Sequence, residues 1–442
     1  MLSACSVDLA GSLGVGGVAS GARTVALVVG DEPFAVRAGA AILAQGGSAV
    51  DAVTATYFTL AVTYPVAAGL GGGGICIVHD ATTGQNEEFD FLARDASGGG
   101  TYAVPGSVRG FALMQSLYGA VPWQRDVSPG EGYAAAGFPI SRALSLQLAQ
   151  SQEAIHADAG LAAEFLDDSG KLKPEGTVVS SPQLAQTLAA VRVRGLEGLY
   201  KGEVAARIIA FSQSQAGGIT VADFGANTAS HGAPQALRMG SALVLLPSQR
   251  VGAGAFAGSL FESLNQAQST NAGADDLQAS IVYAVKQALG KFGVNNVPAN
   301  LGATGFAAVD ARGEAAACAV TMNGPFGSAR SATGTGVVLA RAPGSGPAGV
   351  ASAFLTPVIA LEGEGGSVAL AGAGAGGPNG AAALGYALAR VAKGQTPANS
   401  ADIRSTGVAN DTVNVIACQS AMCVALPDPA GHGLGAAGDA GQ

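Results

Sequence analysis

The side chains most often used for metal binding and acid–base chemistry are few and scattered in this chain. The five cysteines follow no spacing that zinc sites use: they are Cys5, Cys76, Cys318, Cys418 and Cys423. The four histidines form no triad or metal motif, and we expect them to be ordinary surface or loop residues: His79, His156, His231 and His432. Cys418 and Cys423 flank a short turn between two strand-like segments, where a disulfide and two buried thiols both stay open. We therefore predict no metal site and no cofactor.

A glycine-rich segment suggests a different chemistry. Residues 372–377 (Gly-Ala-Gly-Ala-Gly-Gly) fit the pattern G-x-G-x-x-G between a strand-like and a helical segment, as in dinucleotide-binding turns. The segment lies close to the end of the chain, with little room for the remaining strand–helix–strand units. The acidic residue that should bind the ribose is not clearly placed either. Dinucleotide binding is therefore the weaker interpretation.

The elements that position these groups alternate between strand and helix patterns. Residues 24–29, 75–78, 242–246, 306–310, 315–322 and 368–372 have the apolar pattern of strands. Residues 34–45, 105–118 and 380–393 have helical spacing, and Ser48 with Asp51 forms a capping box that opens another helix. A turn at Gly84 predicts a hairpin that returns through residues 88–92. This alternation predicts an α/β protein with a mixed sheet.

Composition excludes several classes of function. The chain has 442 residues, of which 48% are hydrophobic and 12% charged, so it can bury a large core. Its 67 glycines follow no collagen-like period. The net charge of −9 and the lack of a Lys/Arg cluster make nucleic acid an unexpected partner. Apolar stretches are interrupted by Gly and Pro before they reach the ~18 residues of a membrane span.

A collinear series of motifs resembles the gamma-glutamyltranspeptidase family of N-terminal nucleophile hydrolases. Single motifs of this kind are weak, but their shared order from about residue 23 onward is specific. They lie at residues 36–52, 69–74 (Gly-Leu-Gly-Gly-Gly-Gly), 104–110 (Val-Pro-Gly-Ser-Val-Arg-Gly), 137–141, 200–202, 218–224, 308–310, 321–327 (Thr-Met-Asn-Gly-Pro-Phe-Gly) and 376–377.

The resemblance implies a four-layer αββα sandwich, made as one precursor that cuts itself into a large and a small subunit. We expect a tail over residues 1–22, a large-subunit region over 23–303 and a small-subunit region over 304–442, the last two forming one intertwined domain. In the family, an N-terminal Thr attacks a gamma-glutamyl amide, usually of glutathione, and its α-amine can serve as the base. The acyl group then passes to water or to an amino acid.

The position of the family's nucleophile differs in this sequence. Ungapped alignment from Asp310 or Asn323 puts Ala303 at that position and Thr304 one residue later. Alanine has no hydroxyl, so Thr304 is the best remaining candidate, provided that cleavage falls between these two residues. A shift of one residue on a strand turns the side chain to the opposite face. Two hypotheses follow: a gamma-glutamyltransferase or hydrolase that uses Thr304, or an inactive relative that serves as a binding or structural module.

Other site positions follow from the resemblance. Thr321 matches a Thr that orients the nucleophile, Asn323 matches a ligand-contacting Asn, and Gly376 and Gly377 match the pair that forms the oxyanion hole. The family's substrate-binding Arg is replaced by Leu92. Arg94, two residues later, should lie on the same strand face and bind the glutamyl carboxylate, unless it is a solvated hairpin arginine. The family's Ser-Ser pair and its acidic lid motif have no counterpart.

The N-terminal tail suggests a cellular location. Leu2-Ser3-Ala4-Cys5 resembles the bacterial lipobox, in which the Cys is lipidated, and a Gly/Ala/Ser-rich stretch suited to a tether follows. The basic and apolar segments that should precede Cys5 are absent, so we expect an upstream start if the motif is real. A chance match in a flexible tail is the alternative. The first hypothesis predicts a periplasmic or lipid-anchored protein of the bacterial cell envelope.

Overall fold

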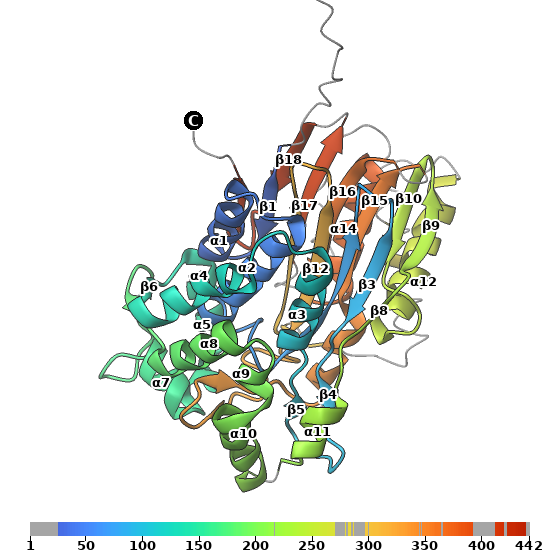
Figure 1. The fold of residues 1–442 in the computed structure, drawn as a ribbon. Helices are drawn as coiled ribbons and strands as arrows, with labels where there is room; N and C mark the ends of the chain where they lie inside the picture. Colours follow the sequence, from blue (N-terminus) through green and yellow to red (C-terminus); the bar gives the residue numbers. More distant parts are fainter. Residues whose placement is uncertain are drawn as a thin grey trace, which may run out of the picture.

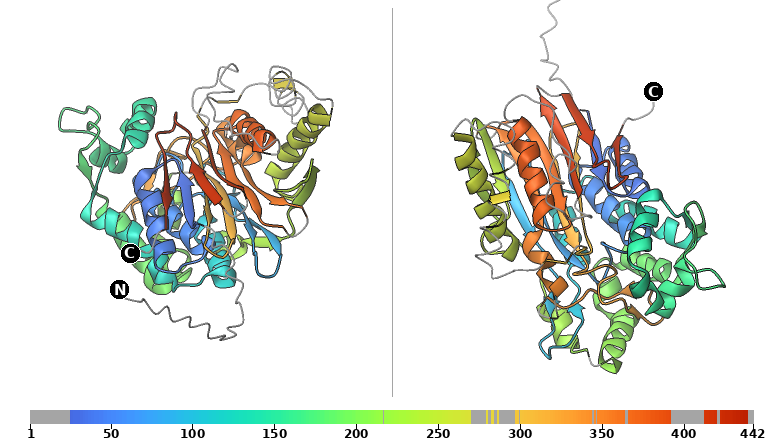
Figure 2. Two further views of the ribbon diagram at one scale, coloured as in Figure 1. Left: turned by 90° about the horizontal axis from the view of Figure 1, so that it is seen from above. Right: turned by 180° about the vertical axis from the view of Figure 1, so that it is seen from behind.

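The computed structural model describes residues 25–438, with gaps at 216, 270–278, 280–281, 284–285, 287–296, 299, 344, 346, 364–365, 392–411 and 420–421. Residues 1–22 and Cys5 lie outside the described part. Two β-sheets pack face to face in its centre, and helices cover the outer face of each sheet (Figure 1). Seen from above, one group of helices lies beside the first sheet and another beside the second (Figure 2). The expected four-layer αββα sandwich is confirmed.

The first sheet has seven strands in the order β19-β1-β11-β12-β2-β3-β8. They are β19 (Leu434–Ala437), β1 (Leu27–Gly30), β11 (Ala303–Val309), β12 (Ala315–Thr321), β2 (Gly73–His79), β3 (Asn86–Asp90) and β8 (Ser230–Gly232). The second sheet has the order β18-β17-β16-β15-β10-β9. Its strands are β18 (Met422–Leu426), β17 (Thr412–Gln419), β16 (Val368–Ala375), β15 (Thr356–Glu362), β10 (Ala242–Leu246) and β9 (Gln235–Met239).

The expected mixed sheet is wrong, because the strand pairs within both sheets are antiparallel. Several consecutive strands are joined by tight turns, which allow only antiparallel pairing. Gly84 (φ 71°) lies in the turn between β2 and β3, and Gly313 (φ 86°) in the turn between β11 and β12. Residues 372–375 also belong to β16, between two antiparallel neighbours. The dinucleotide-binding turn is therefore excluded.

The helices fall into two groups. On the side of the first sheet, α1 (Pro33–Ala44), α2 (Ala49–Thr63) and α3 (Ser107–Tyr118) contact its strands. Further helices of this half pack on that layer or extend below the sheets in Figure 1: α4 (Trp123–Ala136), α5 (Arg142–Gln150), α6 (Gln152–His156), α7 (Ala159–Phe165), α8 (Pro182–Arg194), α9 (Glu197–Tyr200), α10 (Gly202–Ser214) and α11 (Val221–Ala226). The second sheet carries α12 (Gly252–Ser269) and α14 (Pro378–Val391), with the 3₁₀ helix η1 (Pro347–Phe354) nearby. Within the described ranges, no helix is both long and apolar enough to cross a bilayer.

Helix α2 lies at the centre of the first helical layer, and each of its 15 residues is buried. Its capping box at Ser48 and Asp51 is present as predicted. The buried hydroxyls of Thr54, Thr56 and Thr59 donate to backbone carbonyls four residues earlier, which satisfies them inside the core.

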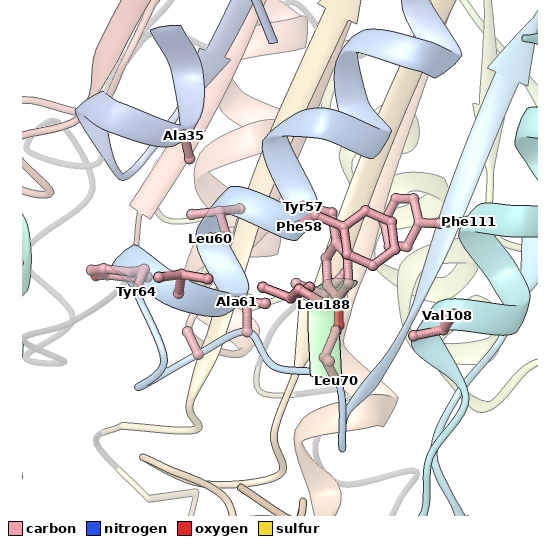
Figure 3. Close-up of a cluster of buried hydrophobic side chains, with 14 of the residues drawn as sticks. Ala35, Tyr57, Phe58, Leu60, Ala61, Tyr64, Leu70, Val108, Phe111 and Leu188 are labelled. Atoms are coloured by element: carbon pink, nitrogen blue, oxygen red, sulfur yellow. The ribbon is translucent and has the colours of Figure 1, made fainter. Parts of the chain in front are cut away.

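The aromatic side chains of α2 pack against α3. Tyr57 stacks on Phe111 with ring centroids 4.2 Å apart, and Phe58 lies beside the same pair (Figure 3). The Tyr57 hydroxyl donates to the carbonyl of Gly69 (2.6 Å). Helix α2 thereby fixes the start of the glycine-rich segment that leads into β2.

Strand β11 contributes to two cores. Phe306 and Ala308 join the cluster under α1 and α2, whereas Ala307 and Val309 join the cluster between the sheets. Because side chains alternate along a strand, residues 303 and 305 face the space between the sheets. Residue 304 faces the helices. Strands from either side of the 303/304 bond contribute to both sheets.

Six short strands form three further pairs: β4 (Arg94–Asp95) with β5 (Ala103–Val104), β6 (Phe138–Pro139) with β7 (Val178–Val179), and β13 (Ser331–Ala332) with β14 (Val337–Val338). Helix α4 was not anticipated. It contains Pro129, a residue that normally interrupts a helical pattern.

Candidate active site

Ala303 begins β11 and faces the space between the two sheets. It packs with a small inter-sheet cluster that includes Ile75, Ala319 and Ala373. Gly305, on the same face, leaves no room for a side chain, because an added Cβ would lie 2.7 Å from the Cβ of Ala373. The backbones of β11 and β16 therefore approach closely here. This approach brings the end of β16, with Gly376 and Gly377, to the Ala303 end of β11.

Thr321 lies directly opposite Ala303 on β12. Its Oγ1 donates to the carbonyl of Gly302 (2.9 Å) and accepts the backbone N–H of Asn323 (2.8 Å). The backbone N–H of Met322 also donates to Gly302 (2.9 Å). Gly302 itself has a left-handed backbone (φ 56°), and an added Cβ would lie 2.0 Å from the carbonyl oxygen of Gly324. Thr321 thus holds the segment that precedes Ala303.

Asn323 is buried and adopts a left-handed backbone (φ 56°). Its Nδ2 donates to the carbonyl of Arg341 (2.9 Å), while its Oδ1 is buried without a hydrogen-bond partner in the described ranges. The Nε of Arg341 is unpaired there in the same sense. A buried acceptor and a buried cationic donor beside one loop are suited to bind a polar ligand group. No motif in the sequence pointed to Arg341.

Gly376 (φ 91°) and Gly377 (φ 121°) follow β16 directly and precede α14. An added Cβ at Gly377 would lie 3.1 Å from Leu301, which neighbours Gly302. The structure therefore brings four sequence-predicted positions to the Ala303 end of β11: Thr321, Asn323, Gly376 and Gly377. Such a pair of glycines can present backbone N–H groups to an oxyanion.

Thr304 is completely buried and points to the helix side of the first sheet. Its Oγ1 donates to Oδ2 of Asp31 (2.7 Å) at the end of β1. The predicted change of face between residues 303 and 304 is confirmed by this arrangement. In the intact chain, the Thr304 hydroxyl is therefore separated from Thr321 and Asn323 by the sheet itself.

Arg94 lies outside this group. The strand-face prediction for Arg94 is wrong, because β3 ends at Asp90 and its pairing with β2 ends at Phe91, which still exchanges backbone hydrogen bonds with Gly74, before the separate strand β4 begins. Alternation cannot be continued across that break. Arg94 is half-exposed and forms an ion pair with Asp90 (2.5 Å). It lines a surface hollow of about 300 Å³ with Asp223 and Asn227.

A second cavity, of about 320 Å³, lies behind the glycine-rich segment. Its walls include Ala61, Leu70, Leu184 and Val338, and Glu164 stands among them. Burial raises the pKa of Glu164 to about 8, partly offset by the nearby charge of Lys173. The cavity does not contain the Ala303 end of β11, so it is not the site that the sequence predicts.

The histidines take no part in this site. Burial lowers the pKa of His79, whose Nδ1 lies 2.8 Å from Oδ1 of Asn86, and His231 pairs with Glu87 (3.2 Å). Within the described ranges, no group of three or more His, Cys, Asp or Glu side chains is arranged to hold a metal ion.

Sequence comparison identifies a related family. The profile described as "Gamma-glutamyltranspeptidase" matches residues 35–289, more than half of the chain. Glutathione hydrolase 2 of Arabidopsis thaliana is 32% identical over 200 residues, which are 42% of this chain and 34% of that protein. The glutathione hydrolase proenzyme of Pseudomonas aeruginosa is 31% identical over 215 residues, 44% of this chain and 38% of that protein. The matches thus span only about a third of these relatives.

Structural comparison extends over more of the chain. A cephalosporin acylase from Bacillus halodurans superposes with a TM-score of 0.74 at 16% identity, covering 94% of this chain and 96% of the acylase. The gamma-glutamyltranspeptidase of Helicobacter pylori gives 0.55 at 24% identity, covering 60% and 82%. At these identities the likeness establishes the fold alone. The profile match ends before Ala303, so it includes none of Thr304, Thr321, Asn323, Gly376 and Gly377.

Proposed function

Because this chain belongs to the gamma-glutamyltranspeptidase family, we propose that it cleaves gamma-glutamyl amide bonds in glutathione-like donors and transfers the acyl group to water or an amino acid. The observation that carries the proposal is the cluster of Thr321, Asn323, Gly376 and Gly377 at the Ala303 end of β11. The names of the relatives, glutathione hydrolases, support the same chemistry.

In this proposal each retained residue has a role that its contacts support. Gly376 and Gly377 present backbone N–H groups to the oxyanion of the tetrahedral intermediate. Asn323 offers its unpaired Oδ1 to a donor group of the substrate. Arg94 lies outside this cluster, so binding the substrate carboxylate requires it to leave Asp90 and move toward the cluster; a guanidinium favours planar, bidentate partners. Thr321 positions the backbone at Gly302.

Thr304 supplies the nucleophile once the Ala303–Thr304 bond is cut. The new N-terminal residue is then released from the covalent chain that fixes it on the helix face, and its α-amine becomes available as a base. The hydroxyl of Thr304 must then turn from Asp31 toward Thr321 and Asn323. The large and small subunits of one precursor are the partners that this route requires.

A second candidate function is favoured by one observation. The side chain that faces the space between the sheets is Ala303, while the Thr304 hydroxyl is buried on the opposite face of the first sheet. A family member with this arrangement can bind a gamma-glutamyl compound without cleaving it, because a fold can be retained after catalytic activity is lost.

Intact-mass spectrometry of the reduced protein, run beside Thr304→Ala, separates the two candidates. The enzyme should yield two fragments divided between residues 303 and 304 and should release p-nitroaniline from gamma-glutamyl-p-nitroanilide, whereas Thr304→Ala should do neither. The binding protein should stay uncut in both forms and bind glutathione in a calorimetric titration. An uncut, inactive protein that fails to bind glutathione would exclude both candidates.

The cellular location is part of the same proposal: an exported protein of a bacterial envelope, anchored by lipid on Cys5. Two disulfides, Cys76–Cys318 and Cys418–Cys423, support an oxidising compartment. The test is the mass of the mature protein isolated from its natural host. A mature form that retains an unmodified Cys5 would contradict lipidation.

A further inference from the structure

Thr304 belongs to a buried polar cluster that ties the two sheets together. Asp31 is its centre: Oδ2 accepts from Oγ1 of Thr304 (2.7 Å) and of Thr412 (3.1 Å). The other oxygen, Oδ1, accepts from Nδ2 of Asn414 (2.8 Å). Asn414 also donates to the carbonyl of Gly305 (3.0 Å) and accepts the backbone N–H of Asp428 (3.2 Å).

This arrangement has the geometry of an activated nucleophile. A hydroxyl lies within hydrogen-bond distance of a base, and a third group, Asn414, orients that base. The first member is the hydroxyl that adjoins the proposed scissile bond.

Burial disfavours the charged form of the Asp31 side chain. Asp31 is 2% exposed, and no Lys, Arg or His side chain forms an ion pair with it in the described part of the chain. Burial raises the pKa of Asp31, and the charge of Asp428 adds to this, whereas hydrogen bonds from Asn414, Thr304 and Thr412 oppose it. An asparagine at position 31 could hold the same strands together without burying a charge. Asparagine could not, however, accept a proton as a general base.

The residue before the scissile bond is also held. Gly302 has a left-handed backbone, and its carbonyl accepts from Thr321 Oγ1 and from the N–H of Met322. The chain is therefore fixed on both sides of the peptide bond between residues 303 and 304, by Thr321 before it and by Asp31 after it. Holding the reacting groups in position lowers the entropic part of the barrier to cleavage.

We propose that Asp31 is the general base for cleavage of the Ala303–Thr304 bond. It accepts the proton of Thr304 Oγ1 as that oxygen attacks the carbonyl carbon of Ala303. The C–N bond then breaks, and the proton passes from Asp31 to the departing amine of Thr304, leaving an ester between the two residues. Water hydrolyses the ester, which gives Ala303 a carboxylate and returns the hydroxyl of Thr304. Asp31 ends the sequence unprotonated, as it began.

This inference rests on the self-cleavage in the proposed function and names the residue that drives it. The experiment follows the cut fraction over time by mass spectrometry after reduction. We expect cleavage in the wild type and in Thr304→Ser, and none in Thr304→Ala. Asp31→Asn keeps the shape and a hydrogen-bond acceptor but not a usable base, so cleavage should slow by about 100-fold or more. Asp158→Asn is the matched control: it makes the same change at another buried carboxylate, which accepts from Leu161 and Ser331 outside this cluster, and it should cleave at nearly the wild-type rate.

Two further variants guard against a folding defect. Circular dichroism and the midpoint of thermal unfolding report whether Asp31→Asn is folded. If it is not, Asn414→Ser decides, since it retains Asp31 but frees its orientation and should slow cleavage by about 10-fold. Cleavage of folded Asp31→Asn, or failing that of Asn414→Ser, at the wild-type rate would overturn the assignment, as would an uncut wild type.

Release of p-nitroaniline from gamma-glutamyl-p-nitroanilide, measured on the same samples, keeps the two proposals apart. A wild type that cleaves through Asp31 but shows no turnover contradicts the proposed activity and leaves the assignment of Asp31 intact. An Asp31→Asn protein that is cut at the wild-type rate and active contradicts the assignment of Asp31 and leaves the proposed activity intact.

Discussion

Single residues at the start of β11 separate the two candidate functions, because neighbouring side chains point into different layers. Ala303 faces the space between the sheets opposite Thr321, which bonds Asn323, whereas Thr304 faces Asp31. A hydroxyl at position 303 would therefore stand where the site expects one. The missing group is small, since Ala and Thr differ by one methyl and one hydroxyl.

The substitution Ala303→Thr should introduce self-cleavage and catalytic activity at this position. We expect cleavage between residues 302 and 303, followed by gamma-glutamyl turnover at least ~100-fold above that of Ala303→Val, which has the same shape without the hydroxyl. Fragment masses after reduction and release of p-nitroaniline are the measurements. An Ala303→Thr protein that shows no turnover would mean that the remaining site residues no longer support acyl transfer.

A buried carboxyl pair sets a second prediction at this scale. Asp126 on α4 lies against Asp51 on α2, whose Oδ2 already accepts backbone N–H groups from Ser48, Ala120 and Val121. Burial raises the pKa of Asp126 from 3.8 to about 9, and the charge of Asp51 adds to the effect. At neutral pH Asp126 is therefore protonated and donates to Asp51.

The sign of the pH dependence follows from this difference in pKa. Between about pH 4 and pH 9 the folded chain holds a proton that the unfolded chain has lost, so the free energy of unfolding decreases as pH rises. Asp126→Asn can donate at any pH and should remove up to about 1 kcal/mol per pH unit of this slope. Urea unfolding at pH 5, 7 and 9 measures it, with the exposed Asp168→Asn as control. Parallel pH profiles for wild type and Asp126→Asn would contradict the protonated pair.

At the scale of elements, the glycine-rich segment before β2 depends on close backbone approach. An added Cβ at Gly73 would lie 2.1 Å from the backbone nitrogen of Ala93 and 2.6 Å from the carbonyl oxygen of Phe91. Neither atom belongs to a flexible side chain, so the strand end has to move. Thr321, which pairs with Gly73 across the sheet, has to move with it.

Gly73→Ala should therefore lower the free energy of unfolding by about 2 kcal/mol or more. Gly132→Ala is the matched control, because an added Cβ at this exposed position of α4 meets no atom within 4 Å. It should be neutral or slightly stabilising, as alanine favours the helix. Urea denaturation of both variants gives the comparison, and a Gly73→Ala protein as stable as wild type would show that the approach is not rigid.

The elements also show how far sequence reasoning reached. Local chemistry was enough where it is self-contained: the capping box at Ser48 and Asp51, the turn at Gly84 and the strands around Gly313 were all predicted. It failed where tertiary structure decides. Helix α4 forms around Pro129, and the extended segment after β3 breaks before Arg94, because packing against other layers overrides local preference.

The same limit applies to the site. The positions of Thr321, Asn323, Gly376 and Gly377 followed from a family pattern, and the structure brings them together. Asp31 and Asn414 had no such pattern. Asp31 meets Thr304 across 273 residues of chain. No periodicity or spacing encodes such a contact, so only the fold reveals it.

At the scale of the whole molecule, both sheets are built from strands on either side of the proposed cut. Cleavage would therefore leave two interleaved fragments that share one core. A disulfide also joins them: Cys76 on β2 lies directly opposite Cys318 on β12, 242 residues further along the chain. The Cys418–Cys423 disulfide, in contrast, lies entirely after the cut.

Self-cleaved protein should consequently migrate as one band on a denaturing gel without reductant and as two bands with it. Cys318→Ser removes the bond between the fragments and should give two bands in either condition. Cys418→Ser removes the other disulfide and should behave like the wild type. Two bands from cleaved wild-type protein without reductant would show that Cys76 and Cys318 are not joined. Because an unreduced sample hides the cut by this linkage, an intact mass without reductant would differ from that of the uncut chain only by the water added at the cleaved bond.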